Sequence, residues 1–189
     1  MRYATSNSCR QGYTLIELLI VVAVLGLAAS LLIPYMAGRS SLETQAAVRR
    51  VIADLSFAQS DALAHQEYRR VYFYPDGRGY CLLRITGAFD AAFDPNTADY
   101  LIDPITVTNS SSHYIVDFTA DSRYAGVSIG TVSIDSSARF ITYDALGGTV
   151  MGGGTLPGTG GYITVTSDEA TYRINIAPFT GKLTVEKID

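Results

Sequence analysis

The chain has 189 residues and a net charge of −4, with 14 basic side chains against 18 acidic ones. Hydrophobic residues make up 48% and charged residues only 17%, which excludes an intrinsically disordered chain. The length favours one folded domain, and the acidic balance argues against a protein that binds nucleic acid through its overall charge. The two cysteines, Cys9 and Cys81, and the two histidines, His65 and His113, have no spacing typical of a zinc site, so we expect neither a metal nor a cofactor.

Apolar residues concentrate in the segment 13–33, where only Thr14, Glu17 and Ser30 are plainly polar. As a helix rising about 1.5 Å per residue, this segment spans roughly 30 Å, the thickness of a bilayer core. Three interpretations compete: a buried core helix, a cleaved secretory signal peptide and a retained membrane helix. The segment ends at Pro34 rather than at a small-x-small cleavage site, which disfavours the secretory signal. The preceding twelve residues carry two arginines and no acid, which predicts that this flank stays cytoplasmic.

The start of the apolar segment resembles the class III signal of type IV pilins and type II secretion pseudopilins. The residues that carry the resemblance are Gly12-Tyr13-Thr14-Leu15-Ile16-Glu17, followed by the long apolar run. The resemblance implies that a prepilin peptidase cuts after Gly12, that the new amino group of Tyr13 is methylated, and that the helix stays in place. Tyr13 stands where the family usually has Phe, a change that keeps an aromatic ring.

Glu17 places a carboxylate in the apolar segment, at a cost on the order of 2.5 to 3.5 kcal/mol if it lay at a bilayer centre. Cleavage after Gly12 creates an ammonium group, with a pKa of about 7.7 to 8, four residues before Glu17. The two charges could pair within one helix, whereas the resemblance implies pairing with a neighbouring subunit of a filament. An ordinary membrane anchor with a stray acid remains the alternative.

Gly26 and Pro34 lie inside and at the end of the apolar helix. Both residue types weaken a helix, and their positions resemble places where helices of family filaments are stretched, so we expect the helix to soften there. The alternative is ordinary membrane-helix composition, in which glycine and proline are common.

A second helical pattern runs from Ser40 to about Gln66, with one apolar stripe that predicts a face packed on a core. The stripe consists of Val48, Val51, Ile52, Leu55, Ala62 and Leu63. Outside the stripe lie Arg49, Arg50, Asp54, Ser60 and Asp61, with Arg50 and Asp54 spaced i,i+4. We expect the two helical segments to form one long bent helix.

After Tyr68 the hydrophobic period changes to two, and β-branched and aromatic residues predominate, which predicts strands. The expected strands are 68–74, 78–85, 113–118, 126–134, 139–144, 162–167, 171–177 and 182–188. The first two form a hairpin, and the last three form a meander. A helix followed by strands predicts an α+β fold, in which the amphipathic helix covers one face of an antiparallel sheet.

The helix sequence VIADLSFAQSDALAHQE and the closing turn Thr180-Gly181-Lys182 are similar to those of GspH/FimT pseudopilins, minor subunits of type II secretion and related filaments. This resemblance implies a pilin-like fold and a structural role in a filament. It divides the chain into a leader (1–12), a transmembrane and filament-core helix (13–35), an amphipathic helix (36–66) and a periplasmic β-rich domain (67–189). The implied partners are prepilin peptidase, other pseudopilins and the bacterial inner membrane.

Two loops interrupt the pattern. The segment 147–161 has eight glycines in fifteen residues, so we expect it to be too flexible for a regular element, and it lacks the lysine of a phosphate-binding loop. The segment 87–104 contains four acids: Asp90, Asp94, Asp99 and Asp103. Their spacing is not that of an EF-hand, which favours a solvated insertion over a calcium site.

No catalytic motif is apparent. His113 follows three serines, but no nucleophile elbow surrounds any serine, so we expect no enzymatic activity. Cys81, in a predicted strand, is expected to be a small core residue. The alternative function is DNA capture by a FimT-like minor pilin, which requires exposed basic residues such as Arg49-Arg50 and Arg69-Arg70. Loss of the leader changes the charge from −4 to −6 (12 basic against 18 acidic residues), which makes nucleic acid an improbable partner.

Overall fold

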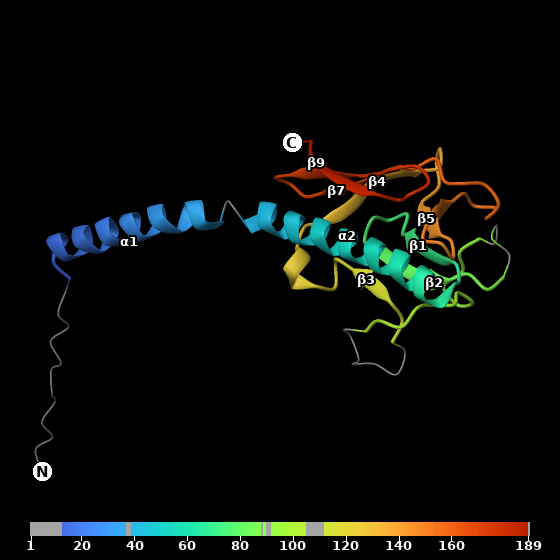
Figure 1. Cartoon of the computed structure of the whole chain (residues 1–189). Coiled ribbons are helices and arrows are strands. Elements are labelled where there is room, and N and C mark those ends of the chain that lie inside the picture. Colours follow the sequence, from blue (N-terminus) through green and yellow to red (C-terminus); the bar gives the residue numbers. More distant parts are fainter. Residues whose placement is uncertain (1–12, 37–38, 88, 90–91, 105–111, 189) are drawn as a thin grey trace, which may run out of the picture. The chain divides into compact units, whose positions relative to one another are not determined.

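The structure is a computed structural model that describes residues 13–36, 39–87, 89, 92–104 and 112–188. The chain divides into two compact units, Met1–Arg39 and Ser40–Asp189 (Figure 1). The predicted cleavage site at Gly12 therefore lies at the edge of the described residues, and the leader lies outside them.

The first unit contains the helix α1, Leu15–Met36, which continues through Gly26 and Pro34. Every side chain described from Tyr13 to Ser30 is exposed within the single chain. A helix that is apolar on all sides is typically covered by lipid or by other helices.

The second unit begins with α2, Arg39–His65, which agrees closely with the predicted second helix. The apolar residues on its buried side are Ala47, Val48, Val51, Leu55, Ala58 and Ala62. Gln66 has a positive φ of 55° and ends the helix in the left-handed conformation that glycine more often provides. Two members of the predicted stripe differ: Ile52 is half-buried and Leu63 is 51% exposed, because the stripe is wider than the face that the sheets cover.

The first sheet is antiparallel and has the strand order β3-β2-β1-β5-β6. Its strands are β1 Arg69–Phe73, β2 Gly79–Arg84, β3 Ile115–Asp117, β5 Phe140–Tyr143 and β6 Thr149–Val150. The predicted hairpin of β1 and β2 is confirmed. Its turn requires Gly77, since φ is 76° and a Cβ there would lie 2.6 Å from the carbonyl oxygen of Ile129.

The second sheet is also antiparallel, with the order β4-β7-β8-β9. Its strands are β4 Ser128–Ile134, β7 Gly161–Thr166, β8 Thr171–Ile176 and β9 Leu183–Lys187. The predicted meander of the last three strands is confirmed. A short 3-10 helix, Ser122–Tyr124, precedes β4.

Two expectations about the β region were wrong. The strands form two sheets rather than one, because β4 pairs with β7 and not with its sequence neighbours of the first sheet. The glycine-rich segment 147–161 contains β6, which pairs with β5, so backbone pairing within the folded domain overrides the flexibility that the composition suggests.

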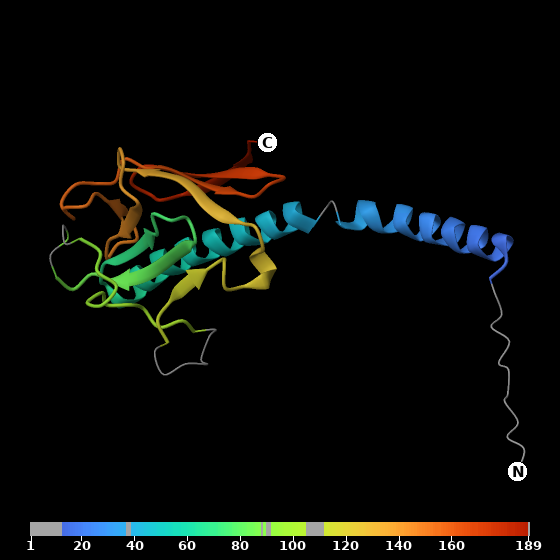
Figure 2. The ribbon, with the colours of Figure 1, turned by 180° about the vertical axis from the view of Figure 1, so that it is seen from behind.

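One hydrophobic core joins α2 to both sheets. The second sheet covers α2 from one side, and β1 and β2 lie along the helix on another side (Figures 1 and 2). A smaller cluster around Tyr74, Cys81 and Leu83 lies on the other face of the first sheet. The unit is therefore an α+β fold whose central strand β1 is covered on both faces.

Candidate functional site

The N-terminal end of α1 begins at a capped position two residues after the predicted cleavage bond. Thr14 accepts a hydrogen bond at its Oγ1 from the backbone N–H of Glu17 (3.3 Å), and its carbonyl accepts one from Leu18 (3.2 Å). This is the arrangement of a helix N-cap. Tyr13, the predicted site of methylation, precedes the cap and is 83% exposed.

Glu17 is exposed on α1, and no ion pair involving it occurs among the described residues. A Cβ added at Gly26 would meet nothing within 4 Å, so this glycine is not required by contacts inside the single chain. The softening predicted at Gly26 and Pro34 stays a prediction. Over the residues that the structure describes, neither helix combines the length and the apolar character needed to cross a bilayer.

A buried polar cluster lies between α2 and the first sheet. Asp54, which is 3% exposed, accepts hydrogen bonds from Arg50 Nε (2.8 Å), Tyr80 Oη (2.6 Å) and Tyr114 Oη (3.0 Å). Arg50 and Asp54, which are spaced i,i+4 in the sequence, form an ion pair. Asp54 is buried although it lies outside the apolar stripe. A carboxylate can be buried here because three donors satisfy its oxygens.

The same contacts alter the acid–base properties of the cluster. Burial and the neighbouring Asp54 carboxylate raise the pKa of Tyr80 and of Tyr114 well above the usual range. Burial by itself would lower the pKa of Arg50, but Asp54 outweighs it and the pKa of Arg50 is raised. All three donors therefore keep their protons at neutral pH, and their hydrogen bonds hold α2 against the first sheet.

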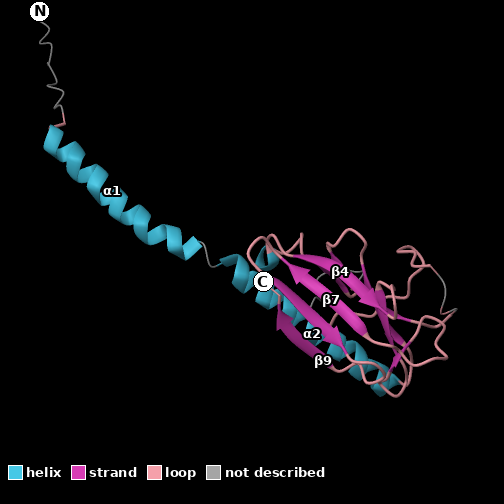
Figure 3. Cartoon of the chain, turned by 90° about the horizontal axis from the view of Figure 1, so that it is seen from above, coloured by secondary structure: helices cyan, strands magenta, loops and turns pink. Residues whose placement is uncertain are grey.

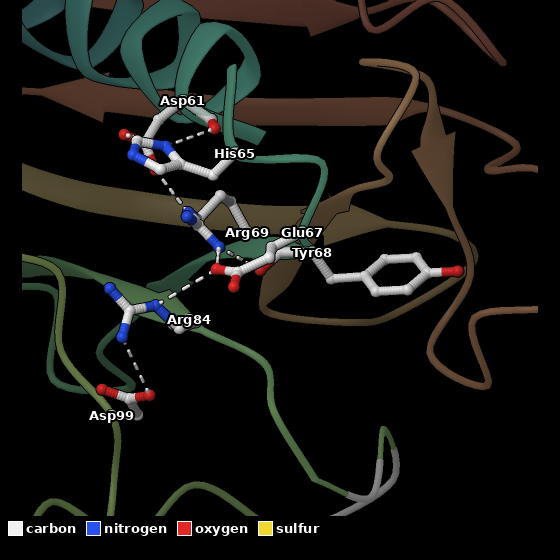
Figure 4. Close-up of polar contacts among 7 residues, drawn as sticks. All are labelled: Asp61, His65, Glu67, Tyr68, Arg69, Arg84 and Asp99. Atoms are coloured by element: carbon white, nitrogen blue, oxygen red, sulfur yellow. Dashed lines mark hydrogen bonds and ion pairs between the residues drawn. The ribbon is translucent and has the colours of Figure 1, made fainter. Parts of the chain in front are cut away.

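A ladder of alternating charges runs from the end of α2 across β1 and β2 (Figure 4). Arg69 lies between Asp61 and Glu67, and its Nη1 is 2.9 Å from the Glu67 carboxylate. Arg84 lies 3.4 Å from the same carboxylate and 3.7 Å from Asp99. Arg69 is only 1% exposed, so the ladder holds a buried cation rather than presenting it to solvent.

Arg70 points to the other face of β1. Its Nε donates to Thr142 Oγ1 (2.9 Å), its Nη2 donates to the carbonyl of Phe89 (3.0 Å), and its guanidinium group lies 4.1 Å from the centre of the Phe140 ring. Arg70 is 5% exposed and forms part of the wall of a cavity of about 650 Å³. The cavity is lined mainly by apolar and aromatic side chains, and Arg84 and Arg139 also line it.

The basic patch considered for DNA binding is therefore not formed by these four arginines. Arg69 and Arg70 are buried on opposite faces of β1, and Arg50 is paired with Asp54, which leaves Arg49 exposed. The strand period of two could have indicated that adjacent arginines face opposite sides. The period could not show that both faces of β1 are covered. No pattern in the sequence indicates that Tyr80 and Tyr114 bond to Asp54.

Several of the remaining candidate residues have partners within the domain. Asp103 is buried, so the expectation of a solvated insertion is wrong for this acid. Asp99 is exposed and pairs with Arg84, and Asp90 lies outside the described residues. No group of three potential metal ligands occurs among the residues that the structure describes. His113 stacks on Tyr100, with ring centroids 4.4 Å apart. Cys81 is buried as predicted, and burial raises the pKa of its thiol to about 12.

Residues 7–33 match a family model described as the prokaryotic N-terminal methylation motif. The motif includes the predicted cleavage bond, the Thr14 cap and most of α1. It indicates a type IV pilin-like protein that is processed by prepilin peptidase, and it points to membrane anchoring and assembly with other pilin subunits. Comparison with curated proteins and with solved structures gives no match for this chain.

Proposed function

We propose that the protein is a structural minor pseudopilin of the GspH/FimT type, a subunit of a type II secretion or related type IV filament. The observation that carries the proposal is that the methylation motif coincides with a capped helix whose described side chains up to Ser30 are all exposed. The α+β unit that follows supports a pilin-like fold. In this proposal the helix anchors the protein in the inner membrane and the α+β unit lies in the periplasm.

The proposed mechanism is assembly rather than catalysis. Prepilin peptidase cuts before Tyr13, and the apolar helix then exchanges lipid for the helices of neighbouring subunits. The new ammonium group at Tyr13 and the carboxylate of Glu17 are the charges available in that apolar setting. Their attraction is much stronger there than in water, because the effective dielectric constant is low, so a pair formed between subunits fixes the axial register.

DNA capture is the weaker alternative. It requires several clustered cations that can reach phosphate groups, because phosphate neutralisation supplies most of the nonspecific affinity. Of the residues considered for this role, Arg69 and Arg70 are buried and held by partners within the domain. Their burial supports the structural role over the nucleic-acid one.

The test is the mature N-terminus of the full chain after coexpression with a prepilin peptidase. Mass spectrometry is expected to find an N-terminal, methylated Tyr13. Gly12→Val, which places a branched side chain at the bond, is expected to leave the chain uncut, whereas the matched variant Gly26→Val is expected to be cut normally. A mature chain that begins beyond Ala37 would indicate conventional secretion and exclude the filament proposal.

A further inference from the structure

β9 is the last strand of its sheet, and its outer edge carries backbone groups that no described strand pairs with. Ile188 donates to the carbonyl of Thr171 (2.9 Å), and Ala177 donates to the carbonyl of Lys182 (2.9 Å). Because hydrogen-bonded pairs alternate along an antiparallel ladder, the even-numbered residues of β9 bond to β8. The N–H and C=O groups of Leu183, Val185 and Lys187 therefore point away from the sheet.

The same odd-numbered residues place their side chains on the core side of the sheet. Val185 pairs with Ile174 and Leu183 pairs with Ile176, and both isoleucines are buried. Val185 itself is 43% exposed, because no strand of the described residues lies beyond β9 to complete the cover. Figure 3 shows β9 at the margin of the sheet that lies over α2. The edge therefore offers hydrogen bonds and an uncovered apolar face together.

The adjoining flank of α2 is also incompletely covered. Gln59 donates to the carbonyl of Thr180, in the turn that leads into β9 (3.0 Å), which fixes this side of α2 beside the second sheet. Ile52 lies two helical turns earlier on the same face and is half-buried.

The chain's only two lysines, Lys182 and Lys187, lie at opposite ends of this edge. Both are exposed, and neither forms an ion pair within the described residues, whereas the neighbouring Glu186 pairs with Arg173 (3.3 Å). Edge lysines oppose indiscriminate strand pairing. Two copies of β9 would bring four lysines to one junction, so the charge favours an acidic partner over a second copy.

We propose that β9 is a docking edge for an extended segment of another protein, with acidic residues at both ends and apolar residues between them. The segment adds as an antiparallel strand: its backbone bonds to Leu183, Val185 and Lys187, its apolar side chains cover Val185, and its acids lie opposite the lysines. The backbone supplies affinity, and the lysines supply selectivity. The inference goes beyond the filament role and does not depend on cleavage at Gly12.

The test uses the full chain in detergent micelles and two fluorescent peptides of six residues. The first, Glu-Thr-Val-Thr-Val-Glu, places acids opposite both lysines, and the second has lysines in place of the acids. The acidic peptide is expected to bind at least tenfold more tightly at low salt, with a smaller preference at high salt. The double variant Lys182→Glu, Lys187→Glu is expected to reverse the preference. The matched double variant Arg49→Glu, Arg78→Glu, with the same change in net charge, is expected to keep it.

Two further measurements separate strand addition from simple charge attraction. Val185→Pro removes an outward N–H without removing a bond to β8, so it is expected to abolish binding with an unchanged circular dichroism spectrum. If Val185→Pro fails to fold, N-methylation of the two valines of the peptide is the substitute test, because it blocks backbone hydrogen bonds to β9 from the peptide. Equal binding of the two peptides, or binding of the N-methylated peptide, would overturn the proposal. Self-association that Val185→Pro abolishes would also overturn it, by making the occupant a second copy.

Discussion

Tyr80 and Asp54 are 26 residues apart in the chain, and their side chains are joined by a hydrogen bond of 2.6 Å inside the domain. The bond ties α2 to β2. Tyr114 repeats the tie from the residue just before β3. The two tyrosine rings pack in the core, and their hydroxyl groups both bond to the Asp54 carboxylate. Directional hydrogen bonds therefore add to apolar packing in fixing the position of α2 on the first sheet.

Replacement of Asp54 is expected to destabilise the domain strongly. Asp54→Ala leaves Arg50 and two tyrosine hydroxyl groups without their acceptor, at a cost of about 2–4 kcal/mol in the free energy of unfolding. Urea denaturation followed by circular dichroism measures the change. Asp76→Asn, which removes an exposed carboxylate paired with Arg78, is the matched control and is expected to cost under about 1 kcal/mol. Equal effects of the two variants would contradict the role of the cluster.

The stability of the domain is expected to fall at alkaline pH. The pKa values of Tyr80 and Tyr114 are raised in the folded state. Above a pH of about 10 the unfolded chain loses tyrosine protons that the folded chain keeps, so the free energy of unfolding decreases as pH rises and these two groups contribute no slope near neutrality. Urea denaturation between pH 7 and 11 gives the slope. Tyr80→Phe is expected to be less stable at pH 7 and to lose less stability between pH 7 and 11.

Glu17→Ala is expected to separate insertion from assembly. The variant removes a charge from an apolar helix, so membrane extraction and the mass of the mature chain are expected to be unchanged or improved. Incorporation beside other subunits is expected to fall about tenfold, equivalent to ~1.4 kcal/mol. Cross-linking in membranes and in sheared filaments measures both steps. Ser30→Ala removes a hydroxyl group that donates a hydrogen bond to the Leu27 carbonyl of its own helix, and it serves as the control. Equal incorporation of Glu17→Ala would make Glu17 a stray acid.

Residues 40–189 are expected to form a soluble monomeric domain that does not bind DNA appreciably. The excess of acidic residues opposes contacts with phosphate groups. The candidate basic patch is not formed, because Arg69 and Arg70 are buried. Fluorescence polarisation at low salt is the sensitive measurement. Micromolar DNA binding that is lost in a stably folded Arg49→Ala variant would favour the DNA-capture alternative.

Arg69→Ala is expected to lower the free energy of unfolding of the domain by about 3 kcal/mol, because it leaves Asp61 and Glu67 without their buried cation.

The thiol of Cys81 is expected to be inert in the folded protein. Burial raises its pKa to about 12, so almost no thiolate is present at pH 8. A thiol reagent is expected to label the single remaining cysteine of the processed chain only after denaturation. Rapid labelling of the native chain would show that the cluster around Tyr74 and Leu83 opens.

The sequence by itself determined the features that local patterns encode. The Gly12–Glu17 signal identified the pilin-like start, and the apolar stripe located α2. The period of two located most of the strands and the closing meander. Each of these depends on residues that are neighbours along the chain, so no knowledge of distant contacts was required.

Only the tertiary structure decided which polar residues are buried and how the strands divide into two sheets. Asp54 has the spacing of a surface ion pair, yet Tyr80 and Tyr114 cover it from distant strands. The two buried arginines of β1 have the composition of a basic patch, yet both faces of this central strand are covered. Burial is a property of what packs on a residue, and those partners lie far away in the sequence.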